Sequence, residues 1–167
     1  MRLFEYQAKD LLKSYGLQVP ASILAKDVSE VRSAFAKLRP PVVLKAQVLA
    51  GGRGKAGGIV SVSDEAHAVT EAKRIFDLAI GGERPSSILV EESFQHEKEM
   101  YLSVTLDRGE RSFVAIAAVA GGVDVESVSD KVVRKIPLAG IDEAFASEVA
   151  REVALSGPQA EQFSKIL

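Results

Sequence analysis

The fold is decided by Gly51-Gly52-Arg53-Gly54-Lys55-Ala56-Gly57-Gly58, a stretch that closely follows the apolar run Pro41-Val42-Val43-Leu44. Glycines at this density let the backbone adopt positive φ angles and approach a ligand closely. Two cations lie inside the stretch, and Lys45 lies a few residues before it. Cations around a glycine-rich loop indicate a ligand with several negative charges. The pattern therefore predicts a cradle for a nucleotide triphosphate.

Two known types of glycine loop do not fit this context. Gly52 to Gly57 matches G-x-G-x-x-G, but a dinucleotide-binding loop must lie between a strand and a helix, and residues 59–62 predict a strand. A Walker A loop needs a hydroxyl after its lysine, whereas Ala56 follows Lys55. What remains is a flap between two strands that folds over phosphates, as in protein kinases, although the chain has no H-R-D or D-F-G sequence.

Lys45 is expected on one face of the predicted strand over residues 42–48. Because side chains alternate along a strand, Lys45 shares a face with Gln47 and lies opposite Leu44. The flap would bring Arg53 over the face that carries Lys45. A solvated lysine beside a flexible glycine hairpin is the alternative, and these residues by themselves leave it open.

Two carboxylates complete the candidate site. Glu91 comes at the end of the predicted strand over residues 86–92, and Glu99 lies on the polar face of the alternating stretch 98–107. At a boundary between two lobes, such groups could hold the adenine amino group and the ribose hydroxyls of a nucleotide. A glutamate at a strand end is more often solvated, so this alternative also stays open.

Periodicity along the chain predicts an α+β fold. The predicted helices cover residues 4–15, 28–38, 64–79, 142–155 and 158–167, and the predicted strands cover 21–25, 42–48, 59–62, 86–92, 98–107, 112–120 and 131–136. Gly16 is predicted to close the first helix, Asp27 and Glu30 to form a capping box, and Ser63 to cap the third helix. The strand pattern changes at residues 92–97, which indicates a domain boundary.

Composition narrows the classes of function. The 167 residues include no cysteine, which excludes disulfides and thiolate metal sites, and 47% are hydrophobic, which indicates a packed core. The formal charge of −2 gives no reason to expect nucleic acid as a partner. The longest apolar run, 113–120, is too short to span a bilayer, and no signal peptide is predicted, so a cytoplasmic protein is expected. His67 and His96 are isolated in polar contexts and are predicted to be surface residues, with no metal site.

Several motifs occur in a fixed order along the whole chain. They are Phe4-Glu5-Tyr6-Gln7-Ala8-Lys9, Tyr15-Gly16-Leu17-Gln18-Val19-Pro20, the strand and glycine loop over 43–58, Ile88-Leu89-Val90-Glu91, Lys98-Glu99-Met100-Tyr101-Leu102, Asp107-Arg108 and Gly121-Gly122-Val123-Asp124-Val125-Glu126. Together they resemble the beta subunits of succinate–CoA ligase (succinyl-CoA synthetase). This resemblance implies an ATP-grasp fold, in which two α+β lobes with mixed or antiparallel sheets hold a nucleotide between them. Residues 1–20 would form a helix and linker packed on the second lobe, 21–94 the lobe with the phosphate flap, and 95–167 the incomplete second lobe.

The same resemblance implies residue roles and a reaction. The implied nucleotide-binding residues are Lys45 at the phosphates, Gly52, Arg53 and Gly54 in the flap, Glu91 and the backbone of Phe94 near the adenine, and Glu99 at the ribose. The family converts succinate, CoA and ATP (or GTP) to succinyl-CoA, ADP (or GDP) and phosphate through a phosphohistidine. That histidine belongs to the partner alpha subunit, so no catalytic residue is expected in this chain.

The resemblance also implies that a large part of the family's active site is missing from this chain. Family beta subunits are more than twice as long, and their acidic and amide ligands for Mg²⁺ lie beyond the position of Leu167. Phosphoryl transfer needs metal to neutralise the developing charge. The chain alone is therefore expected to bind nucleotide weakly and to catalyse no turnover.

Three other interpretations stay open from the sequence. Malate–CoA ligases and the beta-like region of ATP-citrate lyase share the implied architecture, although the spelling Gly51-Gly52-Arg53 favours succinate. A regulatory or assembly module of the same fold would not need Lys45 or Arg53. A carboxylate–amine ligase of the ATP-grasp type would use an amine in place of CoA.

Overall fold

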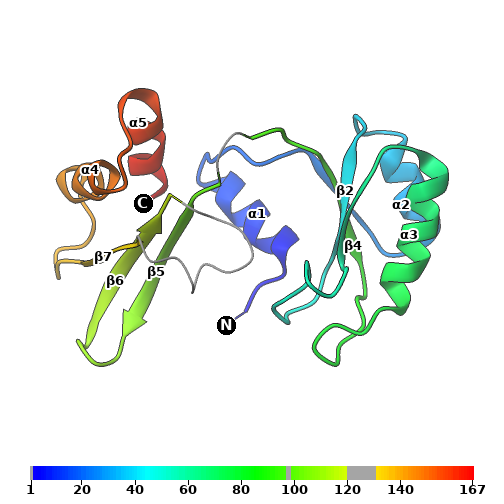
Figure 1. The fold of residues 1–167 in the computed structure, drawn as a ribbon, viewed down its shortest axis with the longest axis horizontal. Helices are drawn as coiled ribbons and strands as arrows, with labels where there is room; N and C mark the ends of the chain where they lie inside the picture. Colours follow the sequence, from blue (N-terminus) through cyan, green and yellow to red (C-terminus); the bar gives the residue numbers. More distant parts are fainter. Residues whose placement is uncertain (1, 97–98, 120–130) are drawn as a thin grey trace. The chain divides into compact units, whose positions relative to one another are not determined.

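The computed structural model describes residues 2–96, 99–119 and 131–167. It divides into two compact units, Met1–Gln95 and His96–Leu167, and each unit is described by itself. Figure 1 shows the helices and strands of both units along the chain. The division falls inside residues 92–97, where the strand pattern of the sequence changes.

A four-stranded antiparallel sheet forms the centre of the first unit. Its strands are β1 (Ser22–Ala25), β2 (Val42–Ala46), β3 (Ile59–Val62) and β4 (Ile88–Glu92), in the order β1-β4-β2-β3. Two helices, α2 (Val28–Phe35) and α3 (Glu65–Asp77), pack against each other and cover one face of the sheet (Figure 1). The predicted strands and helices of this half of the chain are confirmed, most of them with shorter bounds.

β2 has one face in the core and one face outside it. Val42, Leu44 and Ala46 are fully buried, whereas Val43 and Lys45 between them are only partly buried. The buried set packs with apolar residues of both helices, among them Val31, Phe35, Ala68, Ala72 and Ile75. Lys45 therefore lies on the face of the sheet away from α2 and α3, as the alternation along the strand predicts.

Two helix starts differ from the prediction. Asp27 caps α2 by accepting from the N–H of Glu30 (2.8 Å), as predicted, but the Glu30 carboxylate accepts from the N–H of Lys26 instead of closing a reciprocal box on Asp27. The predicted Ser63 cap of α3 is wrong, because Asp64 caps this helix through its carboxylate. A carboxylate at this position also interacts favourably with the helix dipole, which a serine hydroxyl does not.

The first helix, α1 (Glu5–Ser14), precedes the sheet and belongs to the first unit. It begins after Phe4, whose N–H donates to Oε1 of Gln7 (3.0 Å). Gly16 follows the helix with a φ of 79°, which confirms it as the closing residue. No residue of α1 is buried. The packing of residues 1–20 on the second lobe stays a prediction.

The second unit is a three-stranded antiparallel sheet with two helices. Its strands are β5 (Tyr101–Asp107), β6 (Ser112–Ala118) and β7 (Lys131–Lys135), in that order, and its helices are α4 (Glu143–Glu152) and α5 (Gly157–Ile166). The core joins the sheet to both helices through Ala117, Val149, Ala150, Val153 and Phe163. The predicted hairpin, third strand and two helices are confirmed. The Gly121–Glu126 motif lies outside the described residues.

The apolar alternation of β5 is buried only at one end. Leu102 lies opposite Ala117 and packs against the core of the second unit. Leu106 lies opposite Phe113 near the hairpin turn, and the two side chains are 53% and 58% exposed. Alternating apolar residues therefore predict the strand correctly, but burial also depends on how far the helices extend over it.

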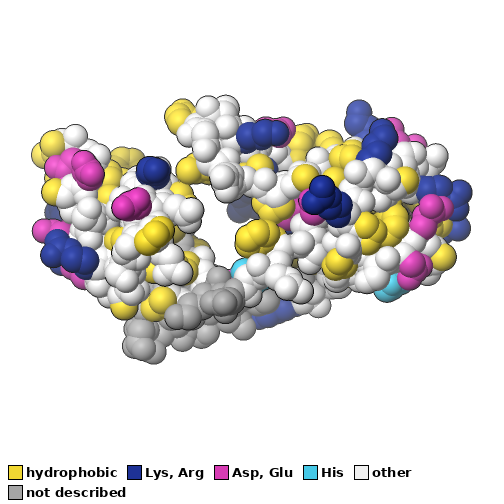
Figure 2. All heavy atoms as spheres, turned by 90° about the horizontal axis from the view of Figure 1, so that it is seen from above, with side chains coloured by type: hydrophobic (Ala, Val, Ile, Leu, Met, Phe, Trp, Pro, Cys, Tyr) yellow, Lys and Arg dark blue, Asp and Glu magenta, His cyan; other side chains and the backbone are white. Residues whose placement is uncertain are grey.

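The surface carries both signs of charge. Figure 2 shows acidic and basic side chains interspersed with apolar ones over the face in view. This mixture matches the small formal charge of the chain. Within the described ranges, no helix combines the length and apolar character needed to cross a membrane.

Candidate functional site

Lys45 lies at the centre of a group of charged side chains on the open face of the first unit's sheet. Its Nζ is 2.7 Å from Oε1 of Glu91 and 3.1 Å from Oε1 of Glu5. Glu91 comes from β4, which pairs directly with β2 and places Glu91 opposite Val43, on the same face as Lys45. Glu5 comes from α1, which is distant in sequence. The site therefore joins two neighbouring strands and the first helix.

Two further cations complete this group, and the five side chains of Glu5, Lys9, Lys45, Arg53 and Glu91 are called the charged cluster below. Lys9 pairs with Glu91 and, at 3.0 Å, with Oε1 of Glu5. Nη1 of Arg53 lies 2.9 Å from Oε2 of Glu5 and donates to the carbonyl of Ala46 at 3.0 Å. The cluster thus holds three cations and two carboxylates. The excess of positive charge suits an anionic ligand.

The charged cluster is largely shielded from solvent, and this changes its titration. The exposed fractions of its side chains range from 6% for Glu91 to 23% for Arg53. Burial by itself raises the pKa of Glu5, but the charges of Lys45 and Lys9 outweigh it and lower that pKa from 4.5 to about 2. Burial lowers the pKa of Lys45, and the hydrogen bond to Glu91 with the charge of Glu5 raises it overall. Both groups are therefore charged at neutral pH.

The lowered pKa of Glu5 predicts a pH-dependent contribution to stability. Because the folded pKa (about 2) lies below the unfolded one (4.5), the contribution is present above pH 4.5 and is lost as the pH falls towards 2. Its size is on the order of 2 kcal/mol, with allowance for partial solvent screening. Urea unfolding should show Glu5→Gln less stable than the original chain by this constant amount from pH 8 to 5, with the difference shrinking below pH 4.5. A difference that stays constant down to pH 3 would contradict the assignment.

The glycine loop is a closed turn between β2 and β3. These strands pair antiparallel, with Lys45 opposite Ile59 at the end where the loop joins them. Within the loop the N–H of Gly58 donates to the carbonyl of Arg53 (2.8 Å), and that of Ala56 donates to the carbonyl of Gly52 (3.0 Å). Gly52 has a φ of 75°, a conformation that favours glycine. The predicted strand–loop–strand flap is confirmed, and its Arg53 lies over the face of Lys45.

The base of the loop is packed tightly against a neighbouring turn. A Cβ on Gly58 would lie 2.6 Å from Cδ1 of Ile80 and 3.2 Å from the carbonyl oxygen of Arg53, and Ile80 is itself buried. A Cβ on Gly81 would lie 2.7 Å from Cβ of Ala50, just before the loop. A side chain at position 58 would therefore require the Ile80 side chain and the Arg53 carbonyl to shift. No local sequence pattern indicates this contact.

The structure brings three of the predicted site residues together. Lys45, Arg53 and Glu91 meet in the charged cluster, and Gly52 and Gly54 lie in the loop beside it. Both carboxylate oxygens of Glu91 are engaged by lysines, so its side chain holds cations within the first unit.

The other two predicted site residues are Phe94 and Glu99. Phe94 follows β4 with 72% of its surface exposed. Glu99 belongs to the second unit, where its Oε1 lies 2.9 Å from Nε2 of His96. The prediction that His96 is isolated is therefore wrong, because its pair with Glu99 lies only three residues away.

Three residues of the site were missed by sequence reasoning. Glu5 and Lys9 are separated by four positions on α1, a spacing at which opposite charges pair on one helix face. That spacing was a usable signal, but it does not say which sheet the pair would meet. Gln47 is almost fully buried, accepts from the N–H of Tyr6 (3.2 Å) and donates to the carbonyl of Lys45 (2.9 Å). It therefore links α1 to the end of β2.

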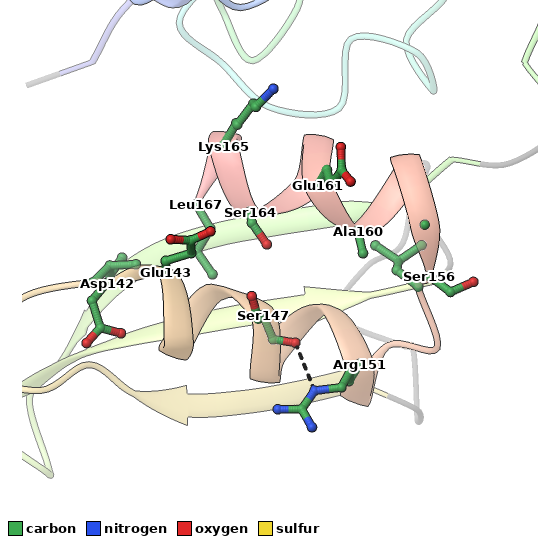
Figure 3. A pocket seen from close by; sticks show the side chains of 13 residues that line it. Asp142, Glu143, Ser147, Arg151, Ser156, Ala160, Glu161, Ser164, Lys165 and Leu167 are labelled. Atoms are coloured by element: carbon green, nitrogen blue, oxygen red, sulfur yellow. Dashed lines mark hydrogen bonds between the residues drawn. The ribbon is translucent and has the colours of Figure 1, made fainter.

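A separate cavity lies in the second unit, between α4 and α5 (Figure 3). It has a volume of about 800 Å³ and is lined by Ile141, Asp142, Glu143, Ser147, Arg151, Leu155, Ser156, Gly157, Ala160, Glu161, Ser164, Lys165 and Leu167. Its acids outnumber its two cations, and one of these, Arg151, donates to the carbonyl of Ser147. This lining does not suit a polyanion. In the described ranges no group of three or more metal-ligating side chains occurs in either unit.

Comparisons with known proteins identify the family of this chain. A family model described as an ATP-grasp domain matches residues 2–167. The chain is 43% identical over 132 residues to a succinate–CoA ligase [ADP-forming] subunit beta from Desulfurococcus amylolyticus, which covers 78% of this chain and 35% of that protein. It is 38% identical over 172 residues to a protein of the same description from Ignicoccus hospitalis, which covers 99% of this chain and 46% of that protein. The chain thus spans less than half the length of these relatives.

A solved structure supports the fold. A protein from Pyrococcus horikoshii matches with a TM-score of 0.77 and 25% sequence identity, over 98% of this chain and 75% of that one. The match runs through both units. The arrangement of strands and helices found for this chain therefore also occurs in a crystal structure.

Proposed function

Because this chain belongs to the ATP-grasp domain family, we propose that its first unit binds the phosphate groups of ATP or ADP at the charged cluster. The observation that carries the proposal is the meeting of Lys45 and Arg53 on one sheet face, directly beside the glycine loop. Lys45 supplies a point charge and Arg53 a planar group with several donors, and both suit phosphate oxygens. The N–H groups around Gly52 and Gly54 add donors at close range.

The remaining residues take supporting roles in this proposal. Glu91 orients Lys45 through their 2.7 Å contact and meets the adenine side through its position at the end of β4. The backbone of Phe94 lies near the adenine, and Glu99 of the second unit holds the ribose. These two roles rest on the resemblance of the motifs to those of the beta subunits.

For the whole protein we propose an acid–CoA ligase. The similar relatives are described as succinate–CoA ligase [ADP-forming] subunit beta, and the chain spans less than half of their length. The proposed reaction converts succinate, CoA and ATP (or GTP) to succinyl-CoA, ADP (or GDP) and phosphate in the cytoplasm. A phosphohistidine on a partner alpha subunit would carry the phosphoryl group. In this chain, the charged cluster would hold the phosphates in position for that transfer.

Magnesium does not fit the residues of this chain that the structure describes. The described parts of both units offer no group of three or more side chains that could hold a metal ion. The two carboxylates of the charged cluster are already paired with lysines and an arginine. From the resemblance of the motifs to those of the beta subunits, we place the Mg²⁺ ligands in the part of the relatives that this chain does not span. The contribution of this chain is to bind and orient the nucleotide.

A titration of thermal unfolding tests the proposed function. The chain is heated with increasing Mg-ADP or Mg-ATP, and MgCl₂ alone serves as the control. A ligand that binds only the folded state adds about 2.7 kcal/mol to the free energy of unfolding at a hundredfold excess over its Kd. We expect Tm to rise with nucleotide concentration and to stay constant in MgCl₂. No rise at millimolar nucleotide would contradict the proposal and would favour an assembly module of the same fold.

A further inference from the structure

The contacts that hold α1 on the first unit are polar. Glu5 and Lys9 form the ion pairs of the charged cluster, and the N–H of Tyr6 donates to Oε1 of Gln47 (3.2 Å). No residue of the helix is buried, and the apolar side chains of Leu11 and Tyr15 are 51% and 79% exposed. Because α1 contributes no side chain to the apolar core, it can leave the sheet without opening that core.

Glu5 bridges the two cations that the proposed function assigns to phosphate. Its Oε1 lies 3.1 Å from Nζ of Lys45, and its Oε2 lies 2.9 Å from Nη1 of Arg53. Oε2 is buried, and its approach to Arg53 lacks the geometry of a hydrogen bond. A carboxylate with one oxygen on each of two cations occupies the place that two phosphate oxygens would take.

The two cations each have a second partner besides Glu5. Lys45 keeps its 2.7 Å contact with Glu91, and Arg53 keeps its bond to the carbonyl of Ala46. Lys9 likewise keeps its pair with Glu91. Glu5 is therefore not required to hold these side chains in place, so its main effect on an incoming anion is repulsion and obstruction.

We infer that α1 is a displaceable strap, in which the Glu5 carboxylate occupies the phosphate position until a nucleotide replaces it. This inference rests on the proposed function, and it adds that binding is coupled to release of the first helix. A nucleoside diphosphate or triphosphate carries more negative charge than one carboxylate, so replacement of the Glu5 carboxylate by the ligand is favoured. The strap lowers the apparent affinity by the free energy of the contacts that Glu5 must give up.

Removal of the Glu5 charge tests the strap. The Kd values of metal-free ADP, inorganic pyrophosphate and adenosine are measured by isothermal titration calorimetry on the original chain, on Glu5→Gln and on Asp10→Asn. Asp10 is the matched control, because it is an exposed acid on the same helix outside the charged cluster. We expect Glu5→Gln to lower the Kd of ADP and pyrophosphate roughly three- to tenfold. Asp10→Asn should leave them unchanged, and neither variant should alter the Kd of adenosine.

The outcomes separate the strap from the proposed function. If the original chain binds ADP and Glu5→Gln binds it equally or more weakly, the strap is wrong and Glu5 instead positions the two cations. If neither chain binds ADP or pyrophosphate, the proposed function fails and the strap fails with it. Glu5→Asp gives a second check that preserves the helix and its charge. Its carboxylate is withdrawn by one methylene, so the Kd of ADP should fall by less than in Glu5→Gln, and a rise would overturn the inference.

Discussion

Replacement of Lys45 by alanine is expected to weaken ADP binding roughly 10- to 100-fold, because it removes a charge-assisted hydrogen bond to phosphate. The ammonium of Lys45 is held at 2.7 Å by Glu91 and is only 19% exposed, so Glu91 fixes its position before a ligand arrives. After this substitution Glu91 is still paired with Lys9, and Glu5 is still paired with Arg53. Titration calorimetry with Mg-ADP measures the loss directly.

Lys37→Ala provides the control for this experiment. Lys37 is an exposed lysine of the same unit, outside the charged cluster, so its loss changes the net charge equally without touching the site. Its Kd for ADP should match that of the original chain. Circular dichroism should show that Lys45→Ala retains the helices and strands. Equal Kd values for ADP in the two variants would show that Lys45 does not bind the nucleotide. The glycine loop would then be interpreted as a flexible hairpin beside a solvated lysine.

Leu44→Ala is expected to cost about 3 to 4 kcal/mol of unfolding free energy, the largest stability effect predicted for a single position. Leu44 is fully buried at the centre of β2, which pairs with both β3 and β4. Truncation leaves a cavity between the sheet and its two helices, and the paired strands limit how far the site can collapse. Urea unfolding of the first unit, followed by hydrogen exchange of the β2 amides, measures the loss.

Leu106→Ala is the matched truncation. Leu106 is 53% exposed near the hairpin of the second unit, so the same change of side chain should cost less than about 0.5 kcal/mol. A loss at Leu44 as small as the loss at Leu106 would mean that β2 is not the centre of a packed core. The placement of Lys45 on the face of the sheet opposite the core would then lose its support.

Local sequence patterns predicted most of the fold of the first unit. The alternation in residues 42–48 placed Lys45 opposite Leu44, and the loop was recognised because a strand follows Gly58. These features depend on residues that are close in sequence, where side-chain period and turn chemistry decide the structure. Where two capping residues are adjacent, as at Ser63 and Asp64, the pattern does not decide between them.

The charged cluster could be predicted only in part, because it is assembled from distant segments. The contacts of Glu5 with Lys45 and of Lys9 with Glu91 span 40 and 82 residues. A charge pattern on one helix indicates which side chains share a face, but it does not identify the sheet that they meet. The close fit of Gly58 against Ile80 is equally non-local, since it depends on where the turn at Gly81 lies.

Because the side chains of β2 alternate strictly between two faces, the proposed ligand site and the core depend on the same register of residues along this strand. Leu44 and Lys45 are neighbours that face opposite environments, so a single-codon deletion in residues 42–44 would turn the ammonium towards the apolar side and an aliphatic side chain towards the ligand. A substitution changes the side chain on one face only, whereas a one-residue shift of register along the strand exchanges the side chains of both faces. Insertions and deletions in this segment should therefore be tolerated less well than amino-acid substitutions.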